Sequence, residues 1–136
     1  MVKNKLQIKP EITIVDKATV IQAVVNDLFD GDAYMPYFYE ISLTDAIARY
    51  LIEGYELEAT DESLYDIVIA DKDFMKLIKK FHYNSEWSDK TNSANSKYID
   101  ALNFIEKNIH EVVEYEKVRH SNNNGVLRDF TNMIER

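Results

Sequence analysis

Two of the three histidines stand close to acidic residues at a spacing that could serve metal binding or catalysis. Glu106, His110 and Glu114 recur every four residues, and Glu116 with His120 repeats that step. A helix would place each set on one stripe. Metal sites of helical proteins use Glu-x-x-His pairs or a His-Glu-x-x-His motif, and neither occurs in this chain. The spacing therefore favours a solvated helix face over a reactive centre.

Residues 29–40, FDGDAYMPYFYE, combine glycine and acidic residues in the manner of a calcium-binding loop. An EF-hand loop needs oxygen ligands at positions 1, 3 and 5, glycine at position 6 and glutamate at position 12. With Gly31 at position 6, Leu28 falls at position 3 and Tyr37 at position 12, so two ligands are missing. We expect no metal or cofactor here, and we expect Gly31 to end a helix and turn the chain.

Other catalytic signatures are absent from the sequence. The chain has no cysteine, which removes thiolate nucleophiles and disulfides. Its three glycines are too far apart for a phosphate-binding loop or a dinucleotide fingerprint. There is no Gly-x-Ser-x-Gly turn, and no pair of carboxylates is singled out for glycoside hydrolysis. We therefore predict that the protein is not an enzyme.

Tyrosine is concentrated in the first half of the chain, where it points to a contact surface. Tyr34, Tyr37 and Tyr39 alternate around Phe38. Tyrosine suits such a surface because it joins a large apolar area to a polar tip. The alternative is an aromatic cluster that packs helix against helix. The predicted partner-contact residues are Tyr34, Tyr37, Phe38, Tyr39, Glu40, Trp87, Ile8 and Ile12.

Charge is distributed unevenly along the chain. The net charge is −8, and residues 18–71 hold twelve acidic residues against one basic residue, Arg49. Phosphate neutralisation needs lysine and arginine, so we expect no direct binding of nucleic acid through this half. A partner with a basic surface fits better. The alternative is that the acidic residues only solvate exposed helix faces.

The first fifteen residues predict an extended arm or edge strand. Leu6, Ile8, Ile12 and Ile14 alternate with polar residues, and Pro10 lacks the N–H of a sheet ladder. No other strand is evident in the sequence. The arm is therefore expected to lie on a neighbouring subunit or to form a hairpin on itself.

Helical periodicity dominates the rest of the chain. The first helix is predicted from Lys17 to Phe29 behind a cap at Asp16, and the second from a cap at Ser42 to Gly54. A third helical region covers 64–81. There Asp71 falls on the apolar stripe, so it either caps a new helix or is buried with a partner.

The second half contains a predicted flexible loop, 83–96, followed by a long helix. The loop is rich in asparagine and serine and holds Trp87, either a core anchor or an interface residue. A seam of heptad type runs from Tyr98 to Val112. The segment SNNNG is expected to break the chain before a short C-terminal helix that ends near Ile134.

These elements predict one mainly α domain, 1–136, built as a small bundle of four to five helices with an N-terminal extended arm or edge strand. The length suits one domain. The N-terminal residues lack the apolar core of a signal peptide, and no stretch approaches a membrane span. We therefore expect no secretion through a signal peptide and no membrane partner.

The segment Ile14 to Glu53, IVDKATVIQAVVNDLFDGDAYMPYFYEISLTDAIARYLIE, resembles small proteins carried by tailed bacteriophages. Members with known roles are often head, neck or tail accessory parts built from a few helices. The resemblance implies a non-enzymatic virion structural or assembly protein that makes protein–protein contacts in a multi-copy assembly, as a homo-oligomer or within a larger phage assembly. It would act in the virion or the host cytoplasm.

A second hypothesis is an acidic inhibitor of the anti-defence kind. Its carboxylates would be spaced like phosphates and would occupy the basic nucleic-acid-binding surface of a host protein. Such binding would weaken steeply with salt.

Overall fold

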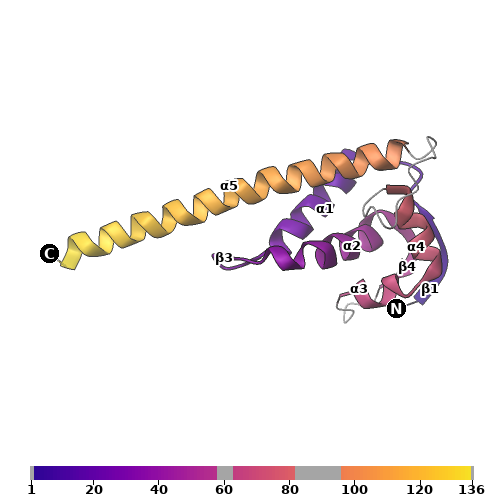
Figure 1. Cartoon of the computed structure of the whole chain (residues 1–136), viewed down its shortest axis with the longest axis horizontal. Helices are drawn as coiled ribbons and strands as arrows, with labels where there is room; N and C mark the ends of the chain where they lie inside the picture. Colours follow the sequence, from indigo (N-terminus) through magenta and orange to yellow (C-terminus); the bar gives the residue numbers. More distant parts are fainter. Residues whose placement is uncertain (1, 58–62, 82–95, 136) are drawn as a thin grey trace.

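The computed structural model describes residues 2–57, 63–81 and 96–135, with the side chains of the last helix described as far as Arg119. Within these ranges the protein is mainly helical, with five α-helices and two small antiparallel sheets (Figure 1). The predicted fold class, a small helical bundle with an N-terminal strand, is confirmed. The predicted loop 83–96, with Trp87, lies outside the described residues except at Ser96.

The N-terminal strand finds its partner inside the chain. Strand β1 (Val2–Ile8) runs antiparallel to β4 (Ile52–Glu56), and Ile8 lies opposite Ile52. The strand ends at Ile8, before Pro10, so the predicted extended arm over the first fifteen residues is a strand only in its first part. Neither a neighbouring subunit nor a local hairpin is needed to pair the arm. Strand β4 was not predicted, because its five residues show no strict alternation.

Gly54 lies within β4 and does not close a helix as predicted. Its φ of +123° is a conformation that residues with a Cβ rarely adopt. A Cβ at this position would lie 2.7 Å from the carbonyl oxygen of Lys5 in the facing strand. The close approach of the two backbones therefore requires glycine.

Helix α1 (Ile14–Asp27) begins three residues earlier than predicted. Thr13, rather than Asp16, is the N-cap: its hydroxyl accepts from the Asp16 N–H at 3.1 Å, and the Asp16 carboxylate accepts from the Thr13 N–H at 3.0 Å. This reciprocal pair is a capping box with aspartate in place of glutamate. The Asp16 carboxylate also pairs with Lys9 Nζ at 2.9 Å. The hydrogen bonds from Thr13 and Lys9 lower the pKa of Asp16.

A tight hairpin connects α1 to α2. Strands β2 (Phe29–Asp30) and β3 (Ala33–Tyr34) pair around Gly31, whose φ is +59°. The predicted turn at Gly31 is confirmed. A 3₁₀ turn, η1 (Pro36–Phe38), then runs directly into α2 (Tyr39–Tyr50).

Ser42 lies inside α2 and does not cap it, contrary to the prediction. Pro36 begins helical backbone six residues earlier, so the chain is already helical when it reaches Ser42. Ser42 and Thr44 are buried polar residues of this helix.

Asp71 confirms the predicted break in the third helical region, which contains α3 (Tyr65–Ile69), α4 (Lys72–Ile78) and the 3₁₀ turn η2 (Lys79–Phe81). Its carboxylate caps α4 by accepting from the Asp73 N–H at 3.0 Å. It also accepts from the Tyr55 hydroxyl at 2.7 Å and from Lys3 Nζ at 2.9 Å. One side chain, 11% exposed, thus joins β1, β4 and α4.

Helix α5 (Ser96–Glu135) has 40 residues and no break at the segment SNNNG. Asparagine and a single glycine each weaken a helix by about 1 kcal/mol or less, and unlike proline they keep the backbone N–H. The predicted seam packs on the body through the buried residues Leu102, Ile105 and Ile109. Val113 is the last buried residue described, and beyond Lys117, which still contacts Tyr34, the helix projects past the other elements (Figure 1).

The core lies where α1, α2 and the first half of α5 meet, with β4, α3, α4 and η2 at one end (Figure 1). Helix α1 contacts both α2 and α5. The largest buried side chains are Phe74, Phe81, Leu28, Leu43, Ile47, Leu51, Leu64, Ile78, Leu102, Ile105, Ile109 and Val20.

Replacing Gly54 with alanine should destabilise the protein by about 1–3 kcal/mol, because the new methyl group meets the Lys5 carbonyl oxygen at a strained φ. Urea unfolding followed by circular dichroism measures the loss. Gly31→Ala is the matched control, since nothing lies within 4 Å of a Cβ there and its loss should be smaller. Equal losses for the two variants would contradict this account.

Replacing Asp71 with alanine should cost about 1–3 kcal/mol at neutral pH, since it removes a cap and two side-chain hydrogen bonds. Burial works to raise the pKa of Asp71, but the bonds from Tyr55, Lys3 and the Asp73 backbone outweigh it, and the pKa is lowered. Burial and Asp71 also raise the pKa of Tyr55, so its hydroxyl stays a donor at neutral pH.

The pH dependence of this stabilisation has a definite sign. A lowered pKa stabilises the folded state above the unfolded pKa of about 3.9, and the effect fades as the pH falls through the folded value. The difference between wild type and Asp71→Ala should therefore shrink below about pH 4. Asp66→Ala, an exposed acidic change on α3, should show little effect at either pH. A constant difference from pH 7 to pH 3 would count against the assigned network.

Candidate functional site

The predicted contact tyrosines divide between core and surface. Tyr34 is half-buried, with its ring centroid 5.3 Å from that of Phe29 and 4.5 Å from Lys117 Nζ of α5. Tyr39 is also half-buried and stacks on His110 of α5, with ring centroids 5.8 Å apart. Both residues therefore fasten the start of α2 and its hairpin to α5.

Tyr37 is the tyrosine that faces outward. Its side chain is 71% exposed, and its ring centroid lies 5.0 Å from that of Phe38, which is 37% exposed. Both residues belong to η1, in which no residue is buried. Glu40 follows in the exposed first turn of α2. Tyr37 and Phe38 form an exposed pair of rings, named here the aromatic lip.

Two other predicted contact residues occupy less accessible places. Ile8 is only 7% exposed because it pairs with Ile52 at the edge of the core, so in the folded chain it packs inward. Ile12 is half-buried and lines a hollow of about 500 Å³ between the β1–α1 connection and the start of α5. Trp87 lies outside the described residues.

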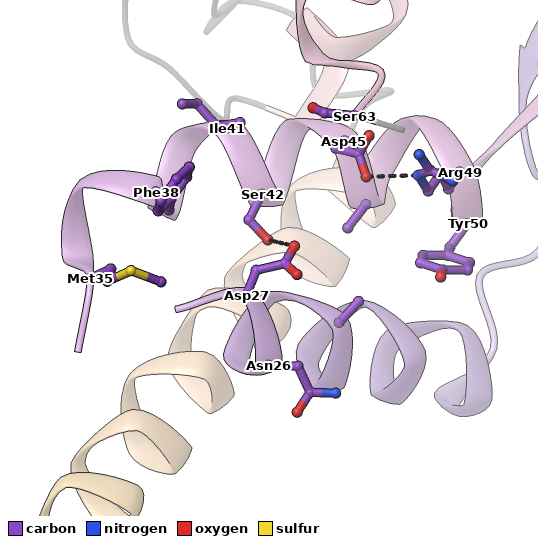
Figure 2. A pocket seen from close by; sticks show the side chains of 12 residues that line it. Asn26, Asp27, Met35, Phe38, Ile41, Ser42, Asp45, Arg49, Tyr50 and Ser63 are labelled. Carbon is purple, nitrogen blue, oxygen red and sulfur yellow. Dashed lines mark hydrogen bonds and ion pairs between the residues drawn. The ribbon is translucent and has the colours of Figure 1, made fainter. Parts of the chain in front are cut away.

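A groove of about 610 Å³ separates α1 from α2 and begins at the aromatic lip (Figure 2). Met35, Phe38 and Ile41 form an apolar end, while Arg49 and Tyr50 lie toward the other end. Its full lining is Ala23, Asn26, Asp27, Met35, Phe38, Ile41, Ser42, Asp45, Ala46, Arg49, Tyr50 and Ser63. The groove thus combines apolar surface with polar groups.

A hydrogen bond between the two helices crosses the middle of the groove (Figure 2). The buried Ser42 hydroxyl donates to Asp27 Oδ2 at 2.7 Å. Because the serine is fixed within α2, the bond orients the Asp27 carboxylate at the end of α1. Asp27 itself is exposed and forms no ion pair with any of the described residues.

The second carboxylate of the groove is already committed to other partners. Asp45 Oδ2 accepts from Arg49 Nε at 2.7 Å, and Asp45 Oδ1 accepts from the Leu64 N–H at 2.6 Å. These bonds tie α2 to the start of α3 and neutralise the one basic residue of the groove. The charge that remains available in the groove is therefore negative and belongs to Asp27.

The sequence predicted contact residues among the tyrosines around Phe38, without deciding which face outward, and it did not predict the groove beside them. Its signal was present as Ser42 and Thr44, two polar residues within the apolar stripe of a helix. The pattern of Ser42 and Asp45 was instead assigned to a helix cap. Both residues use their side chains across elements, to Asp27 and to Leu64, and sequence spacing does not report such contacts.

The stripe of Glu106, His110 and Glu114 does not form a metal cluster in the described part of the chain, where no three potential ligands come together. Glu106 is half-buried beside Tyr39 and His110, while Glu114 pairs with Lys117 at 3.0 Å. Burial raises the pKa of Glu106, with His110 and Tyr39 opposing the rise. Glu106 and His110 thus contact the start of α2 through Tyr39, while Glu114 stays at the surface.

Comparison of the chain with protein-family models, curated proteins and solved structures found no match. Among the described residues, no helix has both the length and the apolar character needed to cross a bilayer. The lip and the groove are therefore the features on which a functional proposal can be based.

Glu106 should make stability depend on pH in the opposite sense to Asp71. Because its folded-state pKa is raised, the folded protein binds the proton more tightly, and the free energy of unfolding should fall as pH rises above about 4.3. Glu106→Gln should flatten this decline in urea unfolding measured from pH 4 upward. The exposed change Glu111→Gln should keep the wild-type slope. An unaltered slope in Glu106→Gln would rule out burial of the carboxyl.

Proposed function

We propose that this protein is a non-enzymatic structural or assembly protein of phage type that acts through protein–protein contacts in a multi-copy assembly. The observation that carries the proposal is the aromatic lip, two neighbouring exposed rings tilted by 35° to each other beside a groove of about 610 Å³. Exposed aromatic side chains next to a hollow are the usual anchors of protein interfaces. The resemblance of residues 14–53 to small tailed-phage proteins supplies the virion context.

The chemistry of the groove supports binding over catalysis. Its charged groups are Asp27, Asp45 and Arg49, and the last two neutralise each other. Among the described residues, Asp27 is held by a serine and pairs with no histidine, lysine or second carboxylate. Such an arrangement recognises a cation or a donor. In the proposed role, the protein would act in the virion or in the host cytoplasm.

A second candidate is an acidic inhibitor that covers a basic surface of a host protein. The observation in its favour is the row of exposed acidic residues around the hairpin and the first turn of α2, namely Asp27, Asp30, Asp32 and Glu40. Salt separates the two candidates. Binding through carboxylates would weaken steeply as salt rises, whereas contact through the aromatic lip would change little.

The aromatic lip is tested by replacing both rings with serine in the full chain. Light scattering coupled to size exclusion should show wild-type masses above the 15.9 kDa of one chain at high protein concentration. Tyr37→Ser with Phe38→Ser should weaken this association by about 30-fold or more, the effect of losing one interface anchor. Both rings are exposed, so the variant should keep its stability.

The matched control is Ile67→Ser, which removes a large apolar side chain that is 48% exposed on α3. It should associate as the wild type does. A wild-type chain that remains monomeric at every concentration would overturn assembly as the function. Equal weakening by the control would show that the lip is not the specific contact.

A further inference from the structure

A second charged surface, on α4 and η2, is positive, whereas the groove is negative. Lys72, Lys76, Lys79 and Lys80 follow one another on α4 and η2 at steps of four, three and one residues. A helical backbone places residues at this spacing on one face. All four side chains are exposed, and none forms an ion pair with a described residue. This set is named here the lysine face.

The acidic residues near the lysine face are engaged elsewhere. Asp71 and Asp73 both accept from Lys3 Nζ, at 2.9 and 3.0 Å. Those bonds direct the two carboxylates toward β1 and leave the four lysines as an excess of positive charge. The groove shows the reverse imbalance, since Asp27 has no cation among the described residues and residues 18–48 contain no lysine or arginine.

We infer that the lysine face of one copy of this chain docks on the α1–α2 groove of a second copy. A lysine stem is apolar along four carbons, so it can lie against Met35, Phe38 and Ile41 while its ammonium group reaches Asp27. The hydrogen bond from Ser42 already orients that carboxylate and reduces the ordering required on binding. Charge complementarity sets the register of the two copies.

The two surfaces belong to different elements of the body (Figure 1). The lip is at the start of α2. Helix α4 packs beside β1, near the end of α2. An interface that joins unlike patches is heterologous, so a bound pair still presents one free groove and one free lysine face. Such a contact closes into a ring or continues as a filament. This inference rests on the proposed multi-copy assembly and names the partner of the groove as the chain itself.

The experiment is a complementation of two variants of the full chain. The first, Asp27→Lys, reverses the charge of the groove. The second, Lys76→Glu with Lys79→Glu and Lys80→Glu, reverses the lysine face. Each alone should associate at least about tenfold more weakly than the wild type in light scattering, because every contact then joins like charges. An equimolar mixture should recover association, since contacts between unlike variants then join opposite charges.

Further measurements distinguish the loss of a contact from misfolding of a variant. Asp27→Asn keeps an acceptor for Ser42 and removes only the charge, so it should weaken association while thermal unfolding stays close to that of the wild type. Raising the salt concentration should weaken the wild-type association in part, through the contact of the lysines with Asp27, and should change the association of Asp27→Asn much less.

The inference would be overturned by a mixture that stays monomeric, or by a lysine-face variant that associates as the wild type does. If association is lost only on changing Tyr37 and Phe38, the multi-copy assembly stands and the docking of the lysine face falls. A wild-type chain that never associates removes both.

Discussion

The antiparallel pairing of β1 with β4 is the constraint on which the arrangement of the helices depends. Strand β1 leads into α1, and α2 leads into β4 after only Leu51, so pairing the two strands holds the start of α1 against the end of α2. The hairpin of β2 and β3 joins the opposite ends of the same helices. Helices tied at both ends must run antiparallel. The groove between them is therefore a product of backbone pairing on either side, and it does not depend on a single side-chain contact.

Helix α5 completes this arrangement by covering α1. Its seam of Leu102, Ile105 and Ile109 supplies one wall of the core, and Tyr34 and Tyr39 reach it from the hairpin and from α2. The aromatic residues around the lip thus have separate tasks. Tyr34 and Tyr39 hold the backbone of η1 and α2 against α5. This support allows Tyr37 to remain exposed in one defined place.

Features decided within a few residues could be predicted from the sequence, and features decided over long separations could not. The turn at Gly31, the cap at Asp71 and the seam of α5 follow from local spacing. Strand β4 exists because β1 pairs with it from 46 residues away, as between Gln7 and Glu53. The bond between Asp27 and Ser42 has the same origin. The break predicted at SNNNG is wrong. These residues have low helix propensity, but each keeps the backbone N–H that a continuous helix needs.

The part of α5 beyond Lys117 would enlarge any movement of the body at the C-terminal end of the helix. At 1.5 Å per residue it forms an arm roughly 30 Å long that the rest of the described chain does not surround (Figure 1). A rotation of the body by about 10° would carry the far end of such an arm through about 5 Å, the length of one helical turn. A small change in how a body is seated would thus be magnified into a displacement large enough to make or break contacts at the C-terminus.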